Sequence, residues 1–153
     1  MNPPKAIGYC ALAALLTLYV VGLVNNEVLR HAVQTLPLWF PIVMGLRQHE
    51  MAKWTALPCF LIWLMLMSVI WLFLMGWTKV ISGSFTSIEV MLTLVIGGAT
   101  IAGSIIALRW HTRVTWTKAL SVSAIFIVFQ TVALRLSFLP AVVKDPIFFV
   151  TRS

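Results

Sequence analysis

The stretch HAVQTLPLWFPIVMGLRQHE, from His31 to Glu50, decides how often this chain crosses a bilayer. The fifteen residues after His31 carry no charge, and two prolines, Pro37 and Pro41, interrupt them. A straight helix of that length covers about 22 Å, which is short of a hydrocarbon core of about 30 Å. The stretch is nevertheless too apolar to remain in water. We therefore predict a short helical segment over 32–46 that is interfacial or re-entrant, with a fifth crossing as the alternative.

The composition places the rest of the chain in lipid as well. Of 153 residues, 61% are hydrophobic and 10% are charged, and the mean hydropathy is +0.99. Soluble domains have about 25% charged residues. The net charge of +7 comes from single basic residues at the ends of apolar runs, where such side chains reach toward anionic headgroups. Because there is no lysine or arginine run, we expect the lipid bilayer as a partner and no nucleic acid.

Four segments are long enough to span a bilayer, since a crossing needs about 20 apolar residues. We predict an all-α integral membrane protein with one domain over 1–153, in which four transmembrane helices are joined by loops and the short segment described above lies between the first and the second. The expected location is a bacterial inner (cell) membrane, in which both termini of this multi-pass chain lie outside. The predicted spans are 6–24, 54–77, 88–108 and 114–139.

The third and fourth spans carry small and polar residues that recur every three, four or seven positions. This spacing puts them on one face of each helix, and a face of small residues allows helices to pack closely in lipid. We predict a helix–helix seam in which Gln130 bonds to Thr100 or Ser104 on the third span, and in which Gly98→Leu disrupts folding or assembly. A polar path along this face is the alternative. The predicted seam residues are Thr93, Gly97, Gly98, Thr100, Gly103, Ser104, Ser123 and Gln130.

A second group of polar residues flanks the opening stretch. With four crossings these residues lie on one side of the membrane, and we predict a polar cluster of Glu27, Arg30, His31, His49, Glu50 and His111. Imidazoles with carboxylates are metal ligands, but no HExxH spacing occurs, and both cysteines lie alone in apolar runs. We therefore predict no metal and no cofactor. Arg135, near the end of the fourth span, is a candidate for contact with a lipid or a ligand.

No catalytic motif is present: the chain has no G-x-S-x-G elbow, P-loop or G-x-G-x-x-G. We therefore expect an accessory or assembly subunit of a larger membrane complex, or a homo-oligomer, packed through the helix seam. One alternative is an enzyme acting on a lipid or quinone-like substrate, with Arg30, His31 and His49 at the headgroups. The other is a small oligomeric channel or transporter lined by the third span.

Overall fold

The computed structural model describes residues 2–79, 85–139 and 142, and these form helices and no strand. Four of the helices are long and apolar enough to cross a membrane, which confirms the expected count of long spans. Their mean hydropathy lies between 1.9 and 2.4. The four are α1 (Pro3–Val24), α4 (Ala52–Leu74), α5 (Ser87–Arg109) and α6 (Trp116–Ser137).

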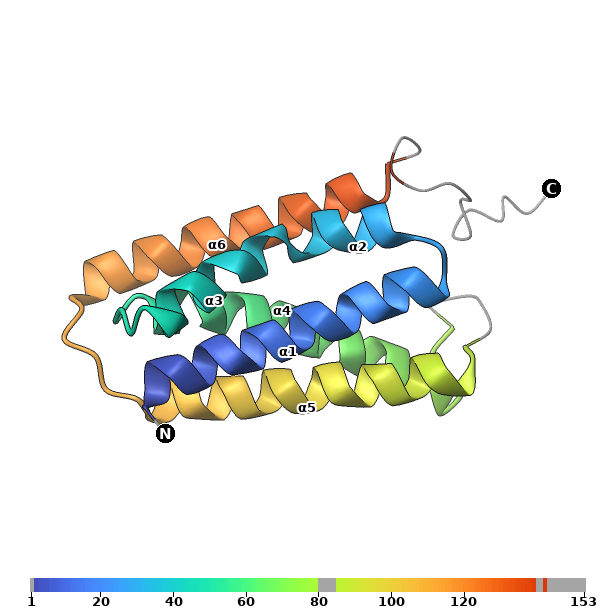
Figure 1. Cartoon of the computed structure of the whole chain (residues 1–153), viewed down its shortest axis with the longest axis horizontal. Helices are drawn as coiled ribbons and strands as arrows, with labels where there is room; N and C mark the ends of the chain where they lie inside the picture. Colours follow the sequence, from blue (N-terminus) through green and yellow to red (C-terminus); the bar gives the residue numbers. More distant parts are fainter. Residues whose placement is uncertain (1, 80–84, 140–141, 143–153) are drawn as a thin grey trace.

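The chain between α1 and α4 lies along the whole length of α1. It consists of α2 (Val28–Thr35), a 3-10 turn η1 (Leu36–Leu38) and α3 (Trp39–Leu46), which follow one another in a broken rod (Figure 1). A Cβ on Gly22 of α1 would lie 3.1 Å from the imidazole of His31, and one on Gly8 would lie 3.3 Å from Gly45. Fourteen residues of α1 separate these contacts, which is about 21 Å at 1.5 Å per residue.

The helical segment predicted over 32–46 is present as part of this rod. The rod from Val28 to Leu46 spans about 30 Å, the thickness of a hydrocarbon core, and it ends at the opposite end of the bundle from where it begins. The sequence estimate of about 22 Å left out His31 and the residues before it, which belong to the same rod. His31 is buried in the bundle, and so are Gln34 and Thr35.

The long helices and the broken rod alternate in direction along the chain. The start of α1 and the end of α6 therefore lie at opposite ends of the bundle (Figure 1). We call the end that holds Pro3, Leu46 and Ala52 the amino end. Around the bundle, α1 packs between α5 and the rod, and α4 packs between α5 and α6. The interior is filled by apolar side chains such as Ile7, Leu15 and Phe60, each at most 1% exposed.

The backbones of α1 and α3 approach each other closely near the amino end. A Cβ on Gly45 would lie 2.6 Å from the carbonyl oxygen of Pro4 and 2.7 Å from the Cα of Gly8. No side chain fits into this contact, so α3 rests directly on the backbone of α1. Close contact of this kind replaces the hydrophobic driving force where helices are surrounded by lipid.

Candidate functional site

The break in the rod creates a buried carbonyl that needs a donor. In a 3-10 turn a carbonyl accepts from the N–H three residues ahead, and for Gln34 that residue is Pro37, which has none. Leaving a buried acceptor unpaired costs about 1–3 kcal/mol. Gln130 of α6, which is fully buried, donates its Nε2 to this carbonyl at 3.0 Å. The amide of Gln130 thus takes the place of the main-chain donor that the proline lacks.

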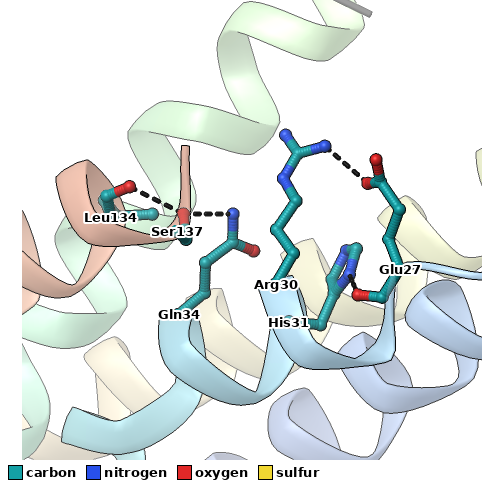
Figure 2. Close-up of polar contacts among 6 residues, drawn as sticks. All are labelled: Glu27, Arg30, His31, Gln34, Leu134 and Ser137. Carbon is teal, nitrogen blue, oxygen red and sulfur yellow. Dashed lines mark hydrogen bonds and ion pairs between the residues drawn. The ribbon is translucent and has the colours of Figure 1, made fainter. Parts of the chain in front are cut away.

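A second contact joins α2 to α6 two turns further along α6. The Gln34 Nε2 donates to the hydroxyl of Ser137 at 3.0 Å, and this hydroxyl donates to the carbonyl of Leu134 at 2.6 Å (Figure 2). Ser137 is fully buried, and Gln34 is 5% exposed. Gln34 therefore receives a hydrogen bond on its backbone and donates one from its side chain, both with α6.

Charged groups gather at the start of α2, beside the end of α6. The Arg30 guanidinium pairs with the Glu27 carboxylate at 2.6 Å and lies 4.5 Å from the centre of the Phe138 ring. The Nδ1 of His31 lies 3.0 Å from the Glu27 carbonyl oxygen (Figure 2). The side chains of Arg30 and Glu27 are only 12% and 10% exposed, so this pair is a largely enclosed part of the α2–α6 contact.

The predicted six-residue polar cluster does not assemble. Glu27, Arg30 and His31 lie at the end opposite the amino end, whereas His49, Glu50 and His111 lie near the amino end. There, the Glu50 carboxylate accepts from the backbone N–H of Arg113 at 3.0 Å, and the His49 Nδ1 accepts from the N–H of Met51 at 3.1 Å. The two halves are separated because 28–46 runs along the bundle instead of returning. Among the described residues, no three His, Cys, Asp or Glu side chains are grouped to hold a metal ion.

The face of α5 that packs against α4 includes Gly97 and Gly103, but the adjacent Gly98 points elsewhere. A Cβ on Gly97 would collide with the Trp71 ring, and one on Gly103 with the Phe60 ring. A Cβ on Gly98 would meet nothing within 4 Å, so Gly98 makes no close contact with another helix of this chain. Thr93, Thr100 and Ser104 are buried on the same side as Gly97.

The hydrogen bonds of the remaining predicted residues differ from one another. Thr100 donates to carbonyls of its own helix at 2.9 and 3.0 Å, so the predicted partner of Gln130 was wrong. Ser123 donates to the carbonyl of Trp54 on α4 at 3.3 Å. Arg135 is exposed. The sequence analysis missed Gln34, although its place three residues before a proline was a usable signal.

Side-chain hydrogen bonds from Gln34, Ser123 and Gln130 each link two helices, so they can hold these helices in register. At the contact between α2 and α6, the residues Gln34, Gln130 and Ser137 are linked by neutral hydrogen bonds. No protein-family model, no curated protein and no solved structure matches this chain.

Proposed function

We propose that the protein is a multi-pass protein of a bacterial inner membrane in which 28–46 forms a fifth crossing. Two observations support this topology: the rod has the length of a hydrocarbon core, and its polar groups pair inside the bundle. Large apolar side chains such as Leu61, Met65 and Ile125 are exposed along the outer faces, where lipid tails would cover them.

The distribution of basic residues favours one orientation of this five-crossing protein. Arginine and lysine near the ends of spans are retained on the cytoplasmic side. The amino end holds six, and the opposite end holds five if Lys144 and Arg152, which follow α6 in the sequence, are counted there. The amino end therefore faces the cytoplasm and α6 ends outside, in place of the expectation that both termini lie outside. The six are Lys5, Arg47, Lys53, Arg109, Arg113 and Lys118.

Within the membrane, the function we propose is that of a packing subunit: the outer face of α5 binds a transmembrane helix of a second copy or of a larger complex. The observation that supports it is the open space at Gly98, with the exposed Ala102 one turn further along. Small residues spaced by four let two helix backbones approach closely in lipid. The glycines that pack inside this protein, Gly97 and Gly103, leave Gly98 unused by its own fold.

The experiment compares Gly98→Leu with Ala124→Leu, which adds the same kind of bulk to an exposed position of α6. Size-exclusion chromatography with light scattering gives the mass of each purified protein and of any stoichiometric partner. We expect Gly98→Leu to lose the second copy or the partner while its thermal unfolding stays unchanged, and Ala124→Leu to behave like the parent. A parent that is monomeric and alone, or a Gly98→Leu variant that keeps its partner, contradicts the proposal.

A further inference from the structure

Among the buried side-chain polar atoms that have no hydrogen-bond partner in the described residues, one on α4 and one on α6 are of opposite hydrogen-bonding type. The indole Nε1 of Trp63 can only donate, and the amide Oε1 of Gln130 can only accept. Trp63 is 3% exposed and Gln130 is fully buried. Buried polar groups in proteins are normally paired with protein or with ordered water. The Trp63 Nε1 therefore requires an acceptor, and the Gln130 Oε1 requires a donor.

The packing of α4 against α6 places these residues at the same height. The two helices run in the same direction, and the bond from the Ser123 hydroxyl to the Trp54 carbonyl fixes their register. Trp63 is nine residues beyond Trp54, and Gln130 is seven beyond Ser123. At 1.5 Å per residue the two levels differ by about 3 Å, and the carbonyl of Trp54 points along the helix in the direction that reduces this difference.

The position of Trp63 is unusual for a protein of this class. Tryptophans of membrane proteins gather at the two interfaces, where the indole N–H reaches water or headgroups. Trp54 and Trp116 follow this rule at the amino end, but Trp63 lies at the middle of α4 (Ala52–Leu74), with its N–H inside the bundle. An indole in that position needs an acceptor that the protein interior provides.

We propose that one internal water molecule binds between Trp63 and Gln130, next to the break in the rod. A hydroxyl group can accept from an indole N–H and donate to an amide oxygen, and water is the smallest molecule that has one. The water then completes the bonding of Gln130, whose Nε2 is already committed to the Gln34 carbonyl. It also fixes which way the amide faces, because a reversed amide would direct an N–H toward another donor. This proposal does not depend on the subunit role of α5.

The test is nuclear magnetic resonance on the full-length protein in detergent micelles, with ¹⁵N-labelled tryptophan. We expect the Trp63 indole proton, assigned by its loss in Trp63→Phe, to show a cross-relaxation peak to a long-lived water. Gln130→Met removes the amide at similar length, so the peak should be lost. Thr131→Val is the matched control on the neighbouring residue, whose exposed hydroxyl bonds to its own helix, and the peak should persist there.

Two results would overturn the proposal. The first is a folded parent protein whose Trp63 indole proton shows no cross-relaxation to water. The second is a water peak that survives unchanged in Gln130→Met, because the water would then be held by other groups. The parent measurement decides the first of these without Gln130→Met, so the proposal stays testable if that variant does not fold.

Discussion

Alanine substitutions at Gly45 and Gly98 form a matched pair that tests the packing of α3 on α1. Gly98 lies in the middle of α5 and Gly45 in the last turn of α3, so alanine brings a gain in helix propensity of at most about 1 kcal/mol at Gly98 and a smaller gain at Gly45. The surroundings differ. At Gly45 the new methyl group would lie 2.6 Å from the Pro4 carbonyl oxygen and 2.7 Å from the Cα of Gly8, whereas at Gly98 nothing lies within 4 Å.

The magnitude follows from those distances. The optimal van der Waals separation of non-bonded carbon atoms is about 3.5–4.0 Å, so α1 and α3 would have to separate by about 1 Å. The obstructing atoms belong to backbone and cannot rotate away. Overpacking of this kind costs about 1–3 kcal/mol. Because the smaller propensity gain at Gly45 acts in the same direction, Gly45→Ala should be less stable than Gly98→Ala by at least about 1–3 kcal/mol.

Thermal or denaturant unfolding of the detergent-solubilised protein, followed by tryptophan fluorescence, measures this difference. Gly98→Ala should unfold at or slightly above the parent, and Gly45→Ala clearly below it. Equal stability of the two variants, or the opposite order, would mean that α3 does not rest on the backbone of α1. The path of the rod along the bundle would then lose its main support.

Two further predictions concern the break and the orientation. Gln130→Leu should lower the free energy of unfolding by about 1–2 kcal/mol. In a Pro37→Ala background the loss should be smaller, because the restored N–H of residue 37 can donate to the Gln34 carbonyl. Equal losses in both backgrounds would show that Gln130 does not replace the donor that the proline lacks. Reporter fusions at the two termini should give signals on opposite sides of the membrane, with the amino terminus in the cytoplasm; signals on the same side would require an even number of crossings.

The four long helices were predictable because each is a continuous apolar run, and hydropathy measures the transfer of such a run into lipid. The segment 28–46 was not, because hydropathy assigns each residue its cost in pure hydrocarbon. His31, Gln34 and Thr35 never meet hydrocarbon: they lie inside the bundle, and Gln34 and Thr35 are hydrogen-bonded there. Where neighbouring helices supply partners, a polar residue no longer marks the end of a segment that packs inside the bundle.

Which face of α5 turns toward the rest of the bundle could not be predicted from the sequence. A helical period identifies residues that share a face, but it does not say which face turns inward. Gly97 and Gly98 are adjacent and point about 100° apart at 3.6 residues per turn. Both belong to small-residue patterns, and only the positions of Trp71 and Phe60 on α4 show that Gly97 and Gly103 are internal. The sequence therefore indicated a close-packed helix without saying which glycine contacts the rest of the bundle.

The break between α2 and α3 is bridged by a residue of the last helix, and this has a consequence for assembly. Without α6, the Gln34 carbonyl and side-chain amide lose both contacts with Gln130 and Ser137, so the rod should not settle into the bundle. We predict that Leu38→Cys, placed in a cysteine-free background, reacts with a membrane-impermeant maleimide when the chain ends at Arg113, but not in the full-length protein, where Leu38 is fully buried. Leu15→Cys in α1 is the control and should stay protected in both chains. If Leu38→Cys is equally protected in the shortened chain, the rod inserts without α6, and the bond from Gln130 follows insertion instead of permitting it.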